Sequence, residues 1–111
     1  MAAPSYELLG QECPTGTGVT NLVTVPGGHQ HIVATLVVNN LTGALAHASI
    51  NIRPLGATLA DKHQCWTDVP VLPGHPEHLT LGLGLDATDV VDVQSDTGSA
   101  LAFHAIGVDL S

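Results

Sequence analysis

The sequence predicts an all-β protein, an antiparallel β-sandwich or jelly roll of about eight strands. Short segments alternate between two faces and are rich in β-branched residues, which is typical of strands. The stretches between them are built from Gly, Pro, Asn, Asp, Ser and Thr, the residues that form turns. One segment alone, GATLADKHQ at 56–64, could hold a helical turn. Strands joined by short loops in this way pack as two antiparallel sheets.

Eight segments have the character of strands. In chain order they are YELLG (6–10), NLVTV (21–25), HIVATLVVN (31–39), ASINIRP (48–54), QCWTDV (64–69), HLTLGLGL (78–85), VVDVQS (90–95) and LAFHAIGVDL (101–110). The segment 31–39 is apolar in both phases, so we expect a central strand covered on both faces, with Ile32, Ala34, Leu36 and Val38 sharing one side.

Two later segments also have a clear phase. Four leucines of the segment 78–85 alternate in register, at Leu79, Leu81, Leu83 and Leu85. The two glycines between the last three leucines lie inside a strand pattern, so they indicate a bend or the close approach of another backbone rather than a nucleotide-binding loop. In the segment 90–95 two valines, Val91 and Val93, share one face.

The composition indicates a subunit of an assembly. The chain has 111 residues, the size of one domain, and we expect a single β-sandwich domain over residues 1–111, of which residues 1–20 could extend as an N-terminal arm. Charged residues make up 11% of the chain and hydrophobic residues 44%, whereas an ordinary soluble domain has about 25% charged residues. Such a surplus of apolar surface predicts contacts with other subunits, in a homo-oligomer such as a trimer or another closed ring.

The charge pattern excludes two classes of partner. Arg53 and Lys62 are the only basic residues against ten carboxylates, for a net charge of −8, so we expect no binding to nucleic acid or to anionic membranes. No apolar run is long enough to insert into a membrane, and the first residues lack the basic start of a signal peptide, which predicts synthesis in the cytoplasm. Cys13 and Cys65 are expected to be free thiols.

The pair His29 and His31 is the first candidate metal site, because a His-x-His on a strand points both imidazoles to one face. Cupins use that arrangement with a glutamate shortly afterwards, where this chain has Thr35 and Leu36. We therefore favour a turn with solvated or interface histidines, and we expect no bound cofactor.

The loop around His75 and His78 is the second candidate metal site, with Glu77 as a third potential ligand, although Pro76 stiffens the loop. An exposed turn is the alternative interpretation. No nucleophile elbow or phosphate-binding loop is present, which favours a protein that is not an enzyme. The carboxylates expected to form turns and keep the chain soluble, rather than to bind calcium, are Asp86, Asp89 and Asp92.

From residue 22 to the C-terminus the order of motifs resembles a group of small β-sandwich virion structural proteins of tailed bacteriophages. In that group a "vTVPa" segment leads into a "vVstLvvcN" strand, followed by "vrPaGatLankH", "ltLglgLaatDvVtVys" and a last strand near "fnlfG". The matching residues here are 24–26, 33–39, 53–63, 79–93 and 103–107. The group's small residues after the first proline are replaced by GGHQH, and its "H-Y" becomes HQCW.

The resemblance implies a non-catalytic structural protein of a phage particle, located in the virion and packed against other virion proteins. It leaves open a minor tail or tail-tip protein and a capsid decoration protein. Two other classes remain: a module that binds a host surface glycan or a host protein, and a jelly-roll metal enzyme. The glycan module has little support in the composition, because sugar-binding sandwiches use stacking rings and this chain has one Tyr, one Trp and one Phe.

Overall fold

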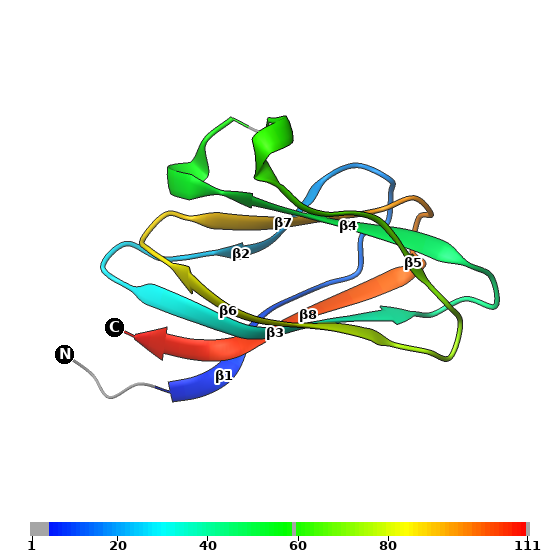
Figure 1. Ribbon diagram of the computed structural model, residues 1–111, viewed down its shortest axis with the longest axis horizontal. Coiled ribbons are helices and arrows are strands. Elements are labelled where there is room, and N and C mark those ends of the chain that lie inside the picture. The colour runs from blue at the N-terminus through cyan, green and yellow to red at the C-terminus, as the bar shows by residue number, and fades with distance from the viewer. Residues whose placement is uncertain (1–4, 59, 111) are drawn as a thin grey trace.

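The computed structural model describes residues 5–58 and 60–110, and nearly all of its regular structure is β-strand. Eight strands follow one another along the chain (Figure 1): β1 (Ser5–Glu12), β2 (Thr20–Thr24), β3 (Gln30–Asn40), β4 (Ala46–Arg53), β5 (Gln64–Val71), β6 (Glu77–Leu85), β7 (Val90–Ser95) and β8 (Leu101–Leu110). Two short 3-10 turns, η1 (Pro54–Gly56) and η2 (Asp61–His63), join β4 to β5. The predicted all-β class is confirmed, as is a helical turn within 56–64.

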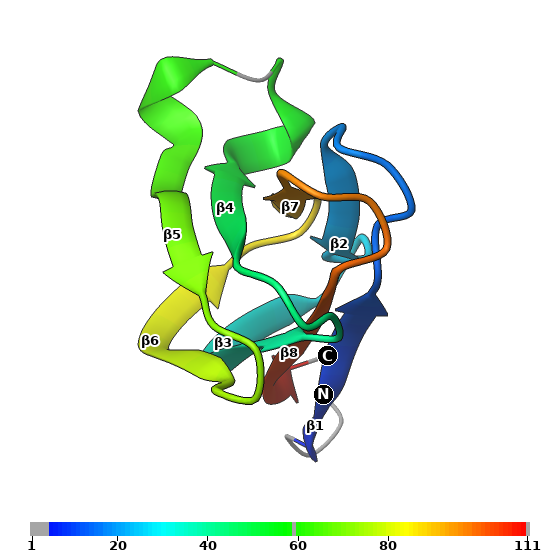
Figure 2. The same cartoon turned by 90° about the vertical axis from the view of Figure 1, so that its right-hand side faces the viewer.

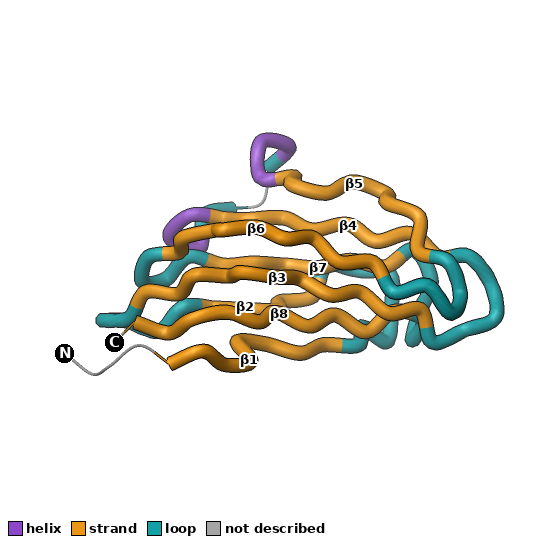
Figure 3. Tube along the Cα trace, turned by 60° about the horizontal axis from the view of Figure 1, so that its bottom comes forward, coloured by secondary structure: helices purple, strands orange, loops and turns teal. Residues whose placement is uncertain are grey.

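The strands form two four-stranded antiparallel sheets, in the orders β1-β8-β3-β6 and β2-β7-β4-β5. We call them the β3 sheet and the β4 sheet. The first strand pairs with the last, the second with the seventh, the third with the sixth and the fourth with the fifth. This order is that of a jelly roll, the more specific of the two predicted architectures. Figure 2 shows the two layers end-on, and in Figure 3 the strands run along the long axis with loops gathered at both ends.

The core lies between the two sheets and is almost wholly aliphatic. Phe103 of β8 is the largest fully buried side chain, and burying such a side chain stabilises the fold by about 1.5–3 kcal/mol. Val91 and Val93 both point into the core, which confirms their predicted phase. Other fully buried side chains around Phe103 are Leu36, Ile50, Leu101, Val33, Val38 and Val71.

A β-bulge on β3 overturns the predicted phase of its first half. Val33 pairs with Gly107 of β8, but the next pair joins Thr35 to Ile106, so that Ala34 is an extra residue. An extra residue moves the following side chains to the other face of a sheet. Val33 therefore faces the core together with Leu36 and Val38, whereas Ile32, which was expected to share their side, faces outward.

Gly107 is the residue of β8 that lets the bulge approach. A Cβ at this position would overlap the carbonyl oxygen of Ile32 and lie 3.0 Å from the amide nitrogen of Ala34. Its φ is not in the left-handed region, so glycine is needed here for space and not for backbone conformation.

The edge strand β6 carries the four leucines predicted to be in phase. Leu85 is buried in the core and Leu79 packs against it. The side chains of Leu81 and Leu83 lie outside the described residues. Relative to β3, β6 contains one extra residue, at 81–82. The irregularities of β3 and β6 lie side by side, so the β3 sheet bends there.

Residues 5–12, inside the segment 1–20 for which an extended arm was considered, form the edge strand β1 and pair with β8. A Cβ on Gly10 would overlap the carbonyl oxygen of Leu22 in β2. Gly10 therefore lets β1 pass close to the other sheet at the point where the chain crosses between layers. Cys13 and Cys65 are exposed and unbridged.

Candidate interaction surfaces

The two histidines of the His-x-His pair converge on one carboxylate. His31 lies directly opposite Asp109 in the pairing of β3 with β8. Nε2 of His31 is 3.4 Å from Oδ1 of Asp109, and Nδ1 of His29 is 3.1 Å from the same oxygen. The prediction that both imidazoles point to one side is therefore confirmed. Of the two alternatives, solvated or interface histidines, the structure excludes solvation for His31, because it is in phase with core-facing Val33 and its side chain is 9% exposed.

His29, His31 and Asp109 join the end of β8 to the start of β3. Nδ1 of His31 is buried and has no hydrogen-bond partner among the described residues. Among the described residues, no group of three His, Cys, Asp or Glu side chains is arranged to hold a metal ion. The candidate metal site at His29 and His31 has no further geometric support, and it remains untested.

His75 and His78 lie near each other in sequence but in different settings. His75 is exposed in the turn between β5 and β6, where its N–H donates to the carbonyl of Leu72 at 3.2 Å. His78 is exposed on β6, opposite Val37 of β3. Glu77 begins β6 and is half-buried. A metal held by these three residues also remains untested.

The three aspartates at 86–92 have structural roles. Asp89 accepts the N–H of Leu55 on Oδ1 at 2.8 Å and that of Asp86 on Oδ2 at 2.9 Å, which confirms its turn-forming role. Asp92 is not a solubilising residue, because its side chain is 3% exposed and its Oδ2 lies 2.6 Å from Nε of Arg53. Arg53, one of the two basic residues of the chain, therefore forms an ion pair within the domain.

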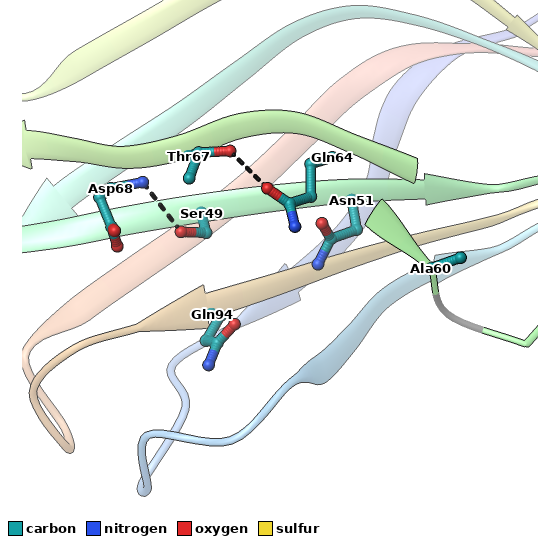
Figure 4. Close-up of a pocket in the computed structure, with 7 residues that line it drawn as sticks. All are labelled: Ser49, Asn51, Ala60, Gln64, Thr67, Asp68 and Gln94. Carbon is teal, nitrogen blue, oxygen red and sulfur yellow. Dashed lines mark hydrogen bonds between the residues drawn. The ribbon is translucent and has the colours of Figure 1, made fainter. Parts of the chain in front are cut away.

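A polar hollow of about 360 Å³ lies on the outer face of the β4 sheet (Figure 4). It is lined by Ser49, Asn51, Ala60, Gln64, Thr67, Asp68 and Gln94. An adjoining hollow of about 250 Å³ shares three of these residues and extends toward Thr17 and Asp96. The lining of the larger hollow offers amide and hydroxyl groups and the carboxylate of Asp68, so it can form hydrogen bonds with a polar ligand.

A bulge of β5 shapes this hollow. The register of β4 with β5 shifts between Ala48 and Ile50, and Asp68 there has a φ of 48°, in the left-handed region that Asp tolerates. The N–H of Asp68 donates to Oγ of Ser49 at 3.0 Å. Figure 4 shows this bond on the wall of the hollow. The hollow was not predicted, because the sequence does not reveal where a strand bulges.

Asp96 borders the adjoining hollow and is bonded to His47. The backbone N–H of His47 donates to Oδ1 of Asp96 at 2.8 Å, and Nδ1 of His47 lies 2.8 Å from Oδ2. These contacts, the backbone hydrogen bond above all, lower the pKa of Asp96 below its usual 3.8 against a smaller opposing effect of burial.

The outer face of the β3 sheet is different in character. Leu8 and Ile32 are 49% and 39% exposed. Ile106 lies beside Leu8, and Val108 lies beside Ile32. By register and alternation the outward positions of the β3 sheet are Leu8, Gln11, Gln30, Ile32, Thr35, Val37, Asn39, His78, Thr80, Gly82, Gly84, Ala102, His104, Ile106, Val108 and Leu110. We call this surface the outer apolar face, after the apolar residues Ile32, Ile106 and Val108 at its centre. The set contains no Asp, Glu, Lys or Arg, and Figure 2 shows no described element over it.

The outer face of the β4 sheet provides the contrast within the same molecule. On β4 itself the outward residues are polar: His47, Ser49, Asn51 and Arg53. The sequence predicted contacts through apolar surface but not which sheet carries that surface. A signal for it existed, because the strand 101–110 is apolar in both phases, which predicts that both of its faces are covered.

Within residues 5–58 and 60–110, no helix is long and apolar enough to cross a membrane.

No family model and no curated protein matches the chain. Among solved structures, a chain in the acid-stable capsid structure of Helicobacter pylori bacteriophage KHP30 is similar over 98% of this chain and 89% of its own length, with 10% identity and a TM-score of 0.56. A chain of infectious bursal disease virus, Gt strain, aligns over 96% of this chain and 31% of its own, with 10% identity and a TM-score of 0.46. The likeness to the phage chain shows a β fold that also occurs in a viral capsid structure, which confirms the resemblance at the level of the fold.

Proposed function

We propose that this chain is a non-catalytic structural protein of a tailed-bacteriophage particle. It is synthesised in the host cytoplasm and packs on the virion surface as a minor tail, tail-tip or capsid decoration protein. Its partners are other virion proteins and further copies of itself, in a trimer or another closed ring. Neither a cofactor nor a metal takes part.

The observation that carries this proposal is the outer apolar face on a jelly roll of 111 residues. Monomeric soluble proteins rarely expose more than a few hundred Å² of contiguous apolar surface, and larger patches mark contacts with other molecules. Jelly rolls also occur in lectins and cupins, so the fold alone does not decide between functions. The apolar face favours packing between subunits over chemistry in a pocket.

The polar hollow of the β4 sheet favours a second candidate, a module that binds a glycan. Its amides and hydroxyls match the hydrogen-bonding groups of a sugar. A stacking ring is missing from its lining, and such rings usually provide much of the affinity for sugars. A glycan array with the wild-type chain and with Asn51→Ala tests this candidate. Binding that the variant loses would favour it.

Quantitative mass spectrometry of purified particles tests the main proposal. Particles banded in a density gradient should contain the chain in a fixed ratio to the principal shell or tail protein. Recovery of the chain only in the soluble fraction of the lysate, with none in the particle band, would refute a virion role.

A further inference from the structure

We propose that the outer apolar face binds the same face of a second copy of this chain, with Gly84 of β6 at the point of closest approach. The inference deepens the proposed function and rests on it, since it assigns the surface through which copies associate.

The two sheets differ in the polarity of their outer faces. In a sandwich that stands alone in water, the outward positions of both sheets are expected to be polar. The β4 sheet follows this rule, with an Arg53–Asp92 ion pair and a hydrogen-bonded hollow on its outer side. The β3 sheet does not, because Ile32, Ile106 and Val108 lie together at outward positions. Covering this face would remove that apolar surface from water.

A glycine of β6 also points to a contact on this face. Gly10 and Gly107 are explained inside the chain, because a Cβ at either would overlap a backbone carbonyl. Gly82 lies where β6 has its extra residue, which explains this glycine inside the chain. Gly84 is not explained inside the chain, because a Cβ there would meet no atom within 4 Å and its φ is not positive. A glycine inside a strand costs about 0.5–1 kcal/mol relative to alanine. Close approach of another backbone is a common reason for such glycines.

Gly84 is in the right place for that role. It pairs with Ile32, which is 39% exposed, and Ile32 in turn pairs with Val108. Gly84 therefore leaves a flat stretch of exposed backbone beside the side chains of Ile32 and Val108. Side chains of the second copy fit against this backbone. A larger residue at position 84 would hold the β3 sheets of the two copies apart.

Charge makes this face the surface through which two copies can meet. Each chain carries a net charge of −8, so two copies repel each other through most of their surfaces. The outward residues of the outer apolar face include no carboxylate, and His78 and His104 are its only titratable side chains among the described residues. Contact through this face therefore avoids bringing carboxylates into direct opposition.

The area is sufficient for a stable contact. β3 has 11 residues, which span about 36 Å, and four strands about 4.8 Å apart cover about 19 Å, so the face measures roughly 700 Å². A standard interface buries about 800 Å² on each partner. A face that binds its own copy forms a two-fold contact and closes with two chains, either alone or between the rings of a larger assembly.

The test is the mass of the purified chain in solution, measured by light scattering on a sizing column and by sedimentation equilibrium. We expect a particle of about twice the 11.4 kDa of one chain. Gly84→Lys should weaken association at least tenfold while its circular dichroism stays that of the wild type, because the monomer has open space at this position. Ile32→Lys should act in the same direction.

The matched control is Thr24→Lys, which adds the same charge at an exposed position of β2 in the other sheet. It should associate at least as well as the wild type. Equal dissociation constants for Gly84→Lys and Thr24→Lys would overturn the proposal. So would a wild-type chain that stays monomeric at millimolar concentration, and if that monomer were nevertheless found in particles, a different virion protein would cover the face and the proposed function would stand.

Discussion

Replacing Gly107 with alanine tests the packing of β8 against the β3 bulge. The new Cβ would overlap the carbonyl oxygen of Ile32 and lie 3.0 Å from the amide nitrogen of Ala34. Both obstacles are backbone atoms in the middle of a sheet, so no side-chain rotation relieves them. The strands must separate by about 1 Å or more, which weakens about two ladder hydrogen bonds of ~1 kcal/mol each and adds about 1–3 kcal/mol of overpacking.

We therefore expect Gly107→Ala to lower the free energy of unfolding by about 3–5 kcal/mol. For a chain of this length that corresponds to a fall in the melting temperature of roughly 12–20 °C. The assay is urea denaturation and thermal melting followed by circular dichroism. Gly84→Ala is the control, because its Cβ meets no atom within 4 Å, and it should be neutral or raise stability by up to about 1 kcal/mol.

Both variants should be compared at concentrations low enough to keep the chain monomeric, because Gly84 also lies on the proposed interface. A Gly107→Ala variant within 1 kcal/mol of the wild type would refute the reasoning, since β8 and the bulge could not then be in the register described.

Three further changes test other parts of the account. Phe103→Ala leaves a cavity between the sheets and should reduce stability by about 3–5 kcal/mol in urea denaturation, and a loss under 1 kcal/mol would place Phe103 outside the core. Asp92→Asn removes the charge paired with Arg53, whose side chain is 22% exposed, so we expect a loss of about 1–3 kcal/mol, less than for a fully buried pair. The variant Arg53→Met with Asp92→Leu should recover part of it, and no recovery would show that the ion pair is not the cause. The lowered pKa of Asp96 stabilises the fold above pH 3.8, the usual value, and this contribution disappears as the pH falls through the lower folded value. Melting curves from pH 6 to pH 2 should therefore show a smaller acid-induced decrease for Asp96→Asn than for the wild type, and identical decreases would contradict the bonds from His47.

The strands could be predicted because alternation and turn residues are local properties. Each of the eight predicted segments overlaps one observed strand, and the valines at 91 and 93 have the predicted phase. Contacts between distant segments could not be predicted in the same way. His31 and Asp109 are neighbours only because β3 pairs with β8 in one particular register, and the histidine pair gave no indication of its carboxylate.

Bulges were the main source of error. The extra residue at Ala34 reverses the facing of Ile32, which the alternation alone placed beside Leu36. The same limitation hid the polar hollow, which depends on the left-handed conformation of Asp68. The expectation that the segment 31–39 is covered on both faces fits the structure only if another molecule covers the outer side, since there the described chain leaves Ile32 39% exposed.

Electron cryomicroscopy of purified particles tests the central claim most directly. We predict density for this jelly roll at repeated positions on the particle, with the outer face of the β1-β8-β3-β6 sheet buried against the same face of another copy. Particles whose density leaves no place for the fold, or in which that face is open to solvent while the outer face of the β2-β7-β4-β5 sheet makes the subunit contacts, would contradict it.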